Sequence, residues 1–306
     1  MRDRSGFHGQ DWLASAVPDG SLLTSSNQLL SSMESNSKER VAELTPDCAY
    51  TRDRFGRPLV SADILERMRK VTTEEAWGVL EEHDYRLQFE GGWHNLQPQR
   101  ILVGRAVTCR FVPQRPDVHE VVTEEGTRNA RDGDQSSWVV DHLEEGDVLV
   151  VELFGKVAGG TAIGHALGSA IARRTGGTGL VVDGGIRELQ HVAELPISVF
   201  CRGVHPAGLD GVTMVEINGP VRIGHATVLP GDVVLGTPTG VIFVPPKLAE
   251  EVVEKSEQTR MRDYFGKMRI TKGVYTPGEV DRAWSESMTA DYEGWRGTVQ
   301  LEDLDL

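Results

Sequence analysis

Cysteine is scarce in this sequence. Among 306 residues there are three cysteines, Cys48, Cys109 and Cys201. The count is odd and the spacing does not match a metal site, so neither a disulfide framework nor a structural zinc site is indicated. This pattern favours a reduced, cytoplasmic protein with buried thiols. Cys201 ends an apolar run and is interpreted as a core residue rather than a nucleophile.

Long apolar runs and positive charge are also lacking. No run approaches the roughly 20 residues of a membrane-spanning helix, and the N-terminal MRDRSGFHGQDW lacks the basic-then-apolar order of a signal peptide. Lys and Arg total 32 against 46 Asp and Glu, which gives a formal net charge of -14. Such an acidic chain argues against nucleic acid or an anionic membrane as a partner. We therefore expect neither.

The nucleotide-binding glycine motifs are missing as well. The glycines of the segment 155–164 follow G-x-x-x-G-G-x-x-x-G rather than G-x-G-x-x-G, and no GK[ST] is present. This disfavours a dinucleotide site. Amides at the beginning of the next helix, near Gly164–Leu167, can still point at an anion, and a carboxylate would suit as well as a phosphate. The alternative is that the glycines merely allow close packing of helix on sheet.

The composition changes along the chain and predicts three parts. Residues 1–40 are rich in Ser, Asn and charge and predict a flexible leader. Residues 41–270 are interpreted as a single α/β domain. Residues 271–306 are interpreted as a C-terminal arm, in which Trp284 and Trp295 either belong to a wrapping arm or subunit contact or pack on their own domain.

Helical spacing appears before and after a β-rich region. It predicts a helix over Ala62–Lys70, a second helix after the capping box Thr72–Glu75, and a long C-terminal helix from about Lys247 to Met268. Apolar runs and turn sequences predict the strands Ile101–Val103, Ala106–Val112, Val212–Ile217, Val221–Ile223, Ala226–Leu229, Val233–Leu235 and Val241–Val244.

A β-loop-α-β-α-β unit lies at the centre of the chain. Its three apolar runs have strand length and suit a buried parallel sheet: Asp147–Leu153, Gly179–Asp183 and Ile197–Cys201. A helix over Ala166–Arg174 stops at Gly176-Gly177, and a short helix begins near Ile186. Because crossovers are right-handed, the loops leaving the carboxyl ends of these strands share one edge. We expect the active site at that edge, with Arg187 at its centre.

Charged residues gather at this predicted edge. Arg187 follows a buried strand and can grip a carboxylate with two hydrogen bonds. Glu188, Asp183 and Glu152 add carboxylates, and one Arg with several carboxylates suits a hard divalent cation and an anionic substrate. A structural Arg–carboxylate pair is the alternative. His165, in the first helical turn, could donate to a substrate, ligate a metal or be structural.

Longer runs of sequence resemble a known family. GDVLVVELFG, GGTAIGHALGSAIA and GTGLVVDGGIRE, then PVRIGHATVLPGDVVLGTPTGVIFVPP, resemble the regulator of ribonuclease activity A (RraA) family, which includes class II 4-hydroxy-4-methyl-2-oxoglutarate aldolases. The resemblance covers roughly residues 58–270. It implies a swivelling β/β/α fold, a homotrimer or hexamer with sites between subunits, a Mg²⁺ or Mn²⁺ cofactor and a small anionic 2-oxo acid substrate.

The resemblance also implies roles for individual residues. Arg187 would bind substrate, Glu188 would ligate the metal, and the substrate loop would be Gly164, His165, Ala166 and Leu167. This sequence departs from the family pattern: His165 and Glu188 each stand where the family has Asp, and the interval between His165 and Arg187 is one residue longer. We add Asp183 as a second candidate metal ligand.

The leading hypothesis is a metal-dependent carbon–carbon lyase. It would cleave a 4-hydroxy-2-oxo acid by retro-aldol chemistry and release pyruvate; oxaloacetate decarboxylation passes through the same enolate. The general base could be a metal-bound water, His165 or Glu152. Two alternatives remain: a non-catalytic regulator that binds a protein such as a ribonuclease, or a sugar-acid isomerase or dehydratase on the same scaffold.

Overall fold

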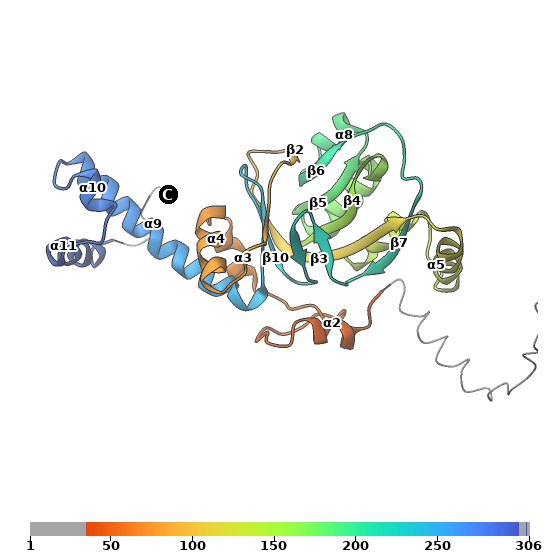
Figure 1. Cartoon of the computed structure of the whole chain (residues 1–306), viewed down its shortest axis with the longest axis horizontal. Coiled ribbons are helices and arrows are strands. Elements are labelled where there is room, and N and C mark those ends of the chain that lie inside the picture. Colours follow the sequence, from red (N-terminus) through yellow and green to blue (C-terminus); the bar gives the residue numbers. More distant parts are fainter. Residues whose placement is uncertain (1–34, 300–303, 305–306) are drawn as a thin grey trace, which may run out of the picture.

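The computed structural model describes residues 35–299 and Leu304 (Figure 1). The predicted leader up to residue 34 therefore lies outside the described residues. Of its remainder, Ser35 forms a bridge with Ile217, and helix α2 (Lys38–Leu44) begins inside the predicted segment.

Two short helices precede the sheet, close to their predicted positions. Helix α3 spans Ala62–Met68 and α4 spans Thr73–Glu82. The capping box is present: the Thr72 side chain accepts from the Glu75 amide, and the Glu75 carboxylate accepts from the Thr72 amide. Reciprocal capping satisfies two helix-end donors and fixes where α4 begins.

A nine-stranded mixed sheet forms the body of the molecule. The strand order is β1-β11-β10-β3-β4-β5-β6-β2, and β7 also pairs with β3. Neighbours from β3 to β6 are parallel. The bounds are β1 Phe89–Glu90, β2 His94–Asn95, β3 Leu102–Pro113, β4 Asp147–Ile163, β5 Gly179–Ile186, β6 Ser198–Val204, β7 Val212–Ile217, β10 Val233–Gly236 and β11 Val241–Val244. Strands β8 (Val221–Ile223) and β9 (Ala226–Val228) pair as a separate hairpin.

The predicted mixed α/β class and the βαβαβ centre are confirmed, with two corrections in the strands. The two strands predicted within residues 101–112 are one continuous strand, β3, because Gly104 and Arg105 pair with β10. Strand β4 does not end at Leu153 but continues to Ile163. The glycine segment therefore lies within β4, although its pairing with β5 is irregular after Glu152.

Helices cover the sheet in separate groups. Helices α5 (Pro116–Arg128), α6 (Gln135–Trp138), α7 (His165–Thr175) and α8 (Leu189–Ala193) and the 3₁₀ turn η1 (Val139–His142) are connected with the parallel strands. Val122, Trp138, Ile171 and Val192 pack there in one buried cluster with alternate residues of β4 and β5. A second cluster joins α3 and α4 to α9 and β10, and a third lies under the β8–β9 hairpin. The site edge thus rests on a rigid core.

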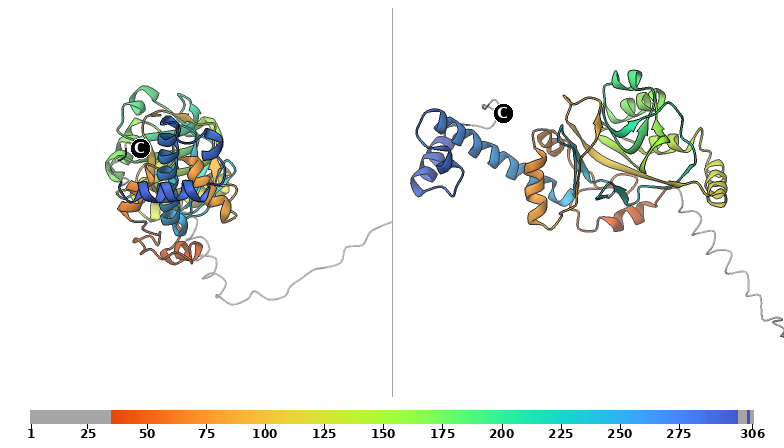
Figure 2. Two further views of the ribbon diagram at one scale, coloured as in Figure 1. Left: turned by 90° about the vertical axis from the view of Figure 1, so that its left-hand side faces the viewer. Right: turned by 45° about the horizontal axis from the view of Figure 1, so that its top comes forward.

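A long helical arm leaves this body. After the turn η2 (Pro246–Leu248), α9 (Ala249–Thr271) projects away from the sheet, and α10 (Pro277–Val280) and α11 (Glu286–Arg296) lie at its far end (Figures 1 and 2). Trp284 and Trp295 stack around Phe265 of α9, with ring centroids 5.7 and 5.5 Å from it. The two tryptophans thus pack on a helix of their own chain, and a contact of the arm with another subunit stays a prediction. No helix in the described part is long and apolar enough to cross a membrane.

Candidate functional site

An interruption in β4 brings the two halves of the site together. Glu152 pairs with Asp183 in regular register, but Lys156 then pairs with Gly184 and Thr161 with Gly185. The chain between Lys156 and Thr161 therefore makes an excursion out of the sheet. Gly160 permits it, since a Cβ there would lie 2.1 Å from the Lys156 carbonyl oxygen. The pairing of β4 with β5 then resumes, which places Gly164 beside the end of β5.

The N-terminus of α7 faces the turn after β5. Gly164 is the N-cap of α7, and the amide of His165 donates to Glu188 Oε2 at 2.7 Å. The next two amides, of Ala166 and Leu167, make no hydrogen bond to any described residue. Unpaired amides in the first turn of a helix bind anions, because they point outward at the positive end of the helix dipole.

Arg187 and Glu188 form the other side of the site. The Arg187 amide donates to the Ile163 carbonyl at 3.0 Å, which ties the end of β5 to the end of β4. Arg187 Nη1 lies 3.1 Å from Glu188 Oε1, and the two side chains are 44% and 36% exposed. Glu188 has a left-handed backbone with φ 58°, which turns its side chain back toward α7. The hydrogen bond from the His165 amide, aided by the positive charge of Arg187, holds the pKa of Glu188 below its usual range.

A cavity of about 220 Å³ opens between these elements. Arg187, Gly164, Ala166 and Leu167 line it on one side. Residues that the sequence gave no reason to select complete the lining: Asp134, Ser136, Ser137, Thr161, Ala162, Gly208 and Leu209. Two of these, Gly208 and Leu209, follow β6, so the rule that loops leaving parallel strands share an edge could have indicated them. Asp134, Ser136 and Ser137 come from α6 and its N-cap, which are distant in sequence and carry no such signal.

The predicted site residues fall into two groups. Arg187, Glu188 and the segment Gly164–Leu167 lie together, and the His165 ring is 5.4 Å from that of His191 on α8. Glu152 and Asp183 lie on the sheet face that carries the β8–β9 hairpin, as strand alternation with Val150 and Val181 requires. There Glu152 accepts from the Arg222 amide at 2.9 Å, and Asp183 accepts from Arg202 Nε at 2.7 Å.

The donor atoms of the first group are compatible with a hard divalent cation. Among the described residues no three His, Cys, Asp or Glu side chains cluster as metal ligands. Glu188 contributes one exposed carboxylate, and each of its oxygens keeps a lone pair beyond the contacts with His165 and Arg187. Mg²⁺ commonly keeps several waters and uses one or two carboxylates together with substrate oxygens. One carboxylate beside an anion site therefore fits Mg²⁺ or Mn²⁺, and does not fit zinc.

Comparisons with known proteins show which sequences and structures this chain resembles. The RraA-like family model, described as Aldolase/RraA, matches residues 61–243. A protein of Halalkalibacterium halodurans named "Putative 4-hydroxy-4-methyl-2-oxoglutarate aldolase" is 31% identical over 143 residues, which are 47% of this chain and 65% of that protein. A protein of the same name from Azotobacter vinelandii is 33% identical over 112 residues, covering 36% and 66%. The chain thus spans slightly less than two thirds of the length of these curated relatives.

A solved structure extends the likeness to most of the described body. It is Streptomyces coelicolor RraAS2, described as an unusual member of the RNase ES inhibitor RraA protein family. The TM-score is 0.57 at 27% sequence identity, and the match covers 70% of this chain and 98% of the other.

Proposed function

The chain belongs to the RraA-like family, and we propose that it is a divalent-metal-dependent lyase that cleaves a carbon–carbon bond of a 2-oxo acid. One observation carries this proposal: Arg187 and two unpaired amides of α7 line a single small cavity, and Glu188 lies beside it in an ion pair with Arg187. Together they offer a cation, anion-binding amides and a hard oxygen ligand. A 2-oxo acid needs all three, because its carboxylate and its 2-oxo oxygen must be held while charge develops.

Arg187 is the proposed anchor of the substrate carboxylate. Its contact with Glu188 involves Nη1, and a guanidinium has five N–H donors, so a carboxylate can bind the remainder. The amides of Ala166 and Leu167 can hold a further substrate oxygen. Glu188 would hold the metal, which when bound supplies Lewis-acid stabilisation of the charge that develops on the 2-oxo oxygen. Asp183 is less well placed for this role, since Arg202 already neutralises it.

The proposed reaction is a retro-aldol cleavage. A base removes the proton of the 4-hydroxyl group, the bond between C3 and C4 breaks, and its electron pair passes to the 2-oxo oxygen as an enolate. C4 and its oxygen leave as the carbonyl group of the second product, and the protonated base returns a proton to C3 of the enolate to give pyruvate. His165 is the favoured base, because its imidazole is exposed and its neighbours Gly164 and Ala166 line the cavity. Glu152 is the weaker candidate, since its Oε2 accepts from the Arg222 amide.

A pyruvate-release assay tests the proposal. The substrate is 4-hydroxy-4-methyl-2-oxoglutarate, and pyruvate is followed by a coupled reduction. We expect activity to disappear with EDTA and return with Mg²⁺ or Mn²⁺. Arg187→Ala should lower kcat/KM by about 100-fold, or roughly 2.7 kcal/mol. Arg115→Ala, which removes an exposed surface ion pair, is the matched control and should change nothing. Metal-independent turnover, or full activity of Arg187→Ala, would exclude the mechanism.

A second candidate is a non-catalytic binding protein. It is favoured by the likeness to RraAS2, which is described within a family of ribonuclease inhibitors. Calorimetry with Mg²⁺ and Mn²⁺ separates the two functions, combined with a pull-down on an RNase E-type ribonuclease. A stable complex without metal binding or pyruvate release would support the binder. Metal binding with pyruvate release would support the lyase.

The assembly state is part of the proposal. We propose a homotrimer or hexamer in which a neighbouring subunit completes the cavity, because the cavity borders an exposed Arg187–Glu188 pair with few other ligands. Light scattering of the full chain after size exclusion tests it, and a monomer that retains full activity would contradict it.

A further inference from the structure

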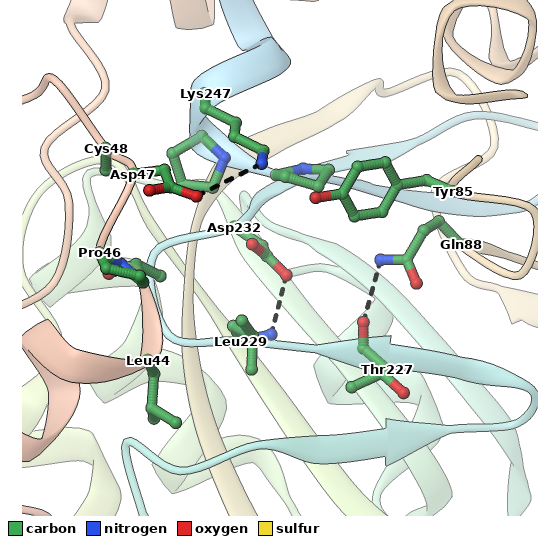
Figure 3. Close-up of a pocket in the computed structure, with 13 residues that line it drawn as sticks. Leu44, Pro46, Asp47, Cys48, Tyr85, Gln88, Thr227, Leu229, Asp232 and Lys247 are labelled. Atoms are coloured by element: carbon green, nitrogen blue, oxygen red, sulfur yellow. Dashed lines mark hydrogen bonds and ion pairs between the residues drawn. The ribbon is translucent and has the colours of Figure 1, made fainter. Parts of the chain in front are cut away.

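A second cavity differs from the cavity at Arg187 in the character of its lining. Its lining is mainly apolar, but it includes one buried carboxyl group. Its volume is about 290 Å³, and it shares no lining residue with the cavity at Arg187. The loop after α2, the loop after α4, β9 and the turn η2 meet around it (Figure 3). Its lining residues come from parts of the sequence that are far apart.

Asp232 is the buried carboxyl group of this cavity. The residue is 2% exposed, and Figure 3 shows its carboxyl group among the lining side chains. Oδ2 accepts from the Leu229 amide at 2.8 Å. Asp232 forms no ion pair with any described residue, and its Oδ1 accepts no hydrogen bond from the described part of the chain. Burial raises the pKa of this carboxyl group to about 7. Burying an ionised carboxylate without a neighbouring cation costs free energy. The carboxyl group of Asp232 therefore lacks a positively charged partner.

Gln88 adds a second acceptor without a donor. Its Nε2 donates to the Thr227 carbonyl at 3.0 Å and to the Phe243 carbonyl at 3.4 Å, which fixes the amide orientation. Its Oε1 then has no donor among the described residues, although Gln88 is 9% exposed. Two largely buried residues of this cavity therefore present oxygens that lack hydrogen-bond donors.

The other lining residues are mostly apolar and could contact the apolar part of a cationic ligand. Leu44, Pro46, Leu229, Pro245 and the Tyr85 ring supply apolar surface. Lys247 is the one basic residue of the lining. Its Nζ lies 3.9 Å from Asp47 Oδ2 and 5.9 Å from the centre of the Tyr85 ring, so that charge is already balanced. Asp232 leaves the lining with one unbalanced negative charge.

We propose that this cavity binds a small organic cation, a primary ammonium on a short apolar body. The ammonium would donate to Asp232 Oδ1 and supply the missing positive charge, and the apolar body would lie against the proline and leucine side chains. An ammonium has three donors for acceptors such as Asp232 and Gln88, whereas an alcohol has one and brings no charge. At about 290 Å³ the cavity is at the small end of ligand sites, which limits the body to a ring or a short chain.

Calorimetric titration of the full chain with benzylammonium at pH 8 tests the proposal, with benzyl alcohol as the neutral probe of matched shape. We expect the ammonium to bind about tenfold more tightly than the alcohol, which corresponds to about 1.4 kcal/mol. Asp232→Asn keeps an acceptor for the Leu229 amide and removes the charge, so it should abolish this preference. Asp281→Asn, an exposed aspartate on the arm, is the matched control and should bind as the unaltered chain does.

A second variant tests the proposal independently of any folding defect in Asp232→Asn. Thr227 is exposed on β9 and lines the cavity, so Thr227→Trp should fill the space while keeping a residue suited to a strand. It should lose binding of both probes, with pyruvate release and Mg²⁺ binding unaffected. Equal binding of the two probes by the unaltered chain, or undiminished ammonium binding by Asp232→Asn, would overturn the proposal.

Discussion

At Gly164 the absence of a side chain decides how closely α7 approaches the turn after β5. A Cβ there would lie 2.8 Å from Glu188 Oε2 and 3.1 Å from Arg187 Nε. The backbone of Gly164 is extended, with φ -124°, so any residue could adopt it. Position 164 therefore needs glycine for a steric reason: a larger residue would collide with Glu188 and Arg187, the side chains that we assign to metal and substrate.

Gly164→Ala should consequently damage the site more than the fold. We expect kcat/KM for pyruvate release to fall by about tenfold to 100-fold, because the added methyl group displaces the pair it touches. The urea midpoint should move little, since both contacted side chains are partly exposed and can give way. Gly294→Ala on α11 is the control, as nothing lies within 4 Å of a Cβ at that position. Unchanged kinetics in Gly164→Ala would remove Glu188 and Arg187 from the proposed roles.

Asp232 predicts a dependence of stability on pH. Burial raises its folded-state pKa to about 7, above the usual value of 3.8 for an aspartate. Between about pH 4 and pH 7 Asp232 is ionised in the unfolded chain but still protonated in the folded chain. Its contribution to the free energy of unfolding is therefore complete below about pH 4 and is lost as pH rises through 7. With about 1.4 kcal/mol per pKa unit, the full loss is on the order of 4 kcal/mol. The other ionisable groups in the lining are Asp47, Lys247, Tyr85 and Cys48.

Asp232→Asn should remove this dependence. In urea unfolding at pH 5 and pH 8, we expect the free energy of unfolding of the unaltered chain to fall more steeply with pH than that of the variant. Asp281→Asn should follow the unaltered chain, because its side chain is exposed. Parallel curves for Asp232→Asn and the unaltered chain would mean that the carboxyl group ionises without penalty, and that it needs no cation.

Among the elements, β4 shows which structural features sequence patterns can predict and which they cannot. The apolar run beginning at Asp147 predicted its first half, and Gly176, with φ 71°, ends α7 where the Gly-Gly signal indicated. Such features depend on local periodicity and local backbone preference. The second half of β4 could not be predicted, because its pairing with β5 requires an excursion whose size is set by tertiary contacts. The same holds for Glu152 and Asp183, whose partners Arg222 and Arg202 lie in distant segments.

Gly160 is the position on which the β4 excursion depends. A Cβ at Gly160 would lie 2.1 Å from the Lys156 carbonyl oxygen and 2.7 Å from its carbonyl carbon, and these backbone atoms cannot move independently of the sheet. We expect Gly160→Ala to lower the free energy of unfolding by about 1–3 kcal/mol and to reduce pyruvate release. Gly78→Ala in α4 is the contrasting control: it has open space and should raise stability by up to about 1 kcal/mol. Equal urea midpoints for the two variants would show that the excursion tolerates a side chain.

At the scale of the whole molecule, residues 35–299 bury apolar surface in two places. One is the sheet with its covering helices, and the other is the aromatic cluster around Phe265, Met288 and Tyr292 at the end of the arm. Helix α9 runs without a break from the first to the second. The predicted boundary at residue 270 therefore falls inside a continuous helix, one residue before its end. Removing the arm there would expose Phe265, which is fully buried.

The N-terminal boundary can be tested in the same terms. Asn36 Nδ2 donates to Glu216 Oε1 at 2.9 Å and to the Asn218 carbonyl at 3.3 Å, and the Asn36 amide donates to the Ile217 carbonyl at 3.0 Å. The Ser37 hydroxyl caps α2 by accepting from the Arg40 amide. Residues 35–40 are thus attached to β7, although the sequence assigns them to a leader. The domain should begin at residue 35 rather than at residue 41.

Two truncated chains decide between these boundaries. A chain that begins at residue 35 keeps the contacts with β7 and should unfold in urea at the midpoint of the full chain. A chain that begins at residue 41 loses the cap and the hydrogen bonds of Asn36, and should be less stable by about 1–3 kcal/mol. Asn36→Ala in the full chain should reproduce part of that loss, since it leaves the Glu216 carboxylate without this donor. Identical midpoints for the two truncated chains would place the boundary at residue 41, because the contacts of residues 35–40 would then contribute nothing to folding.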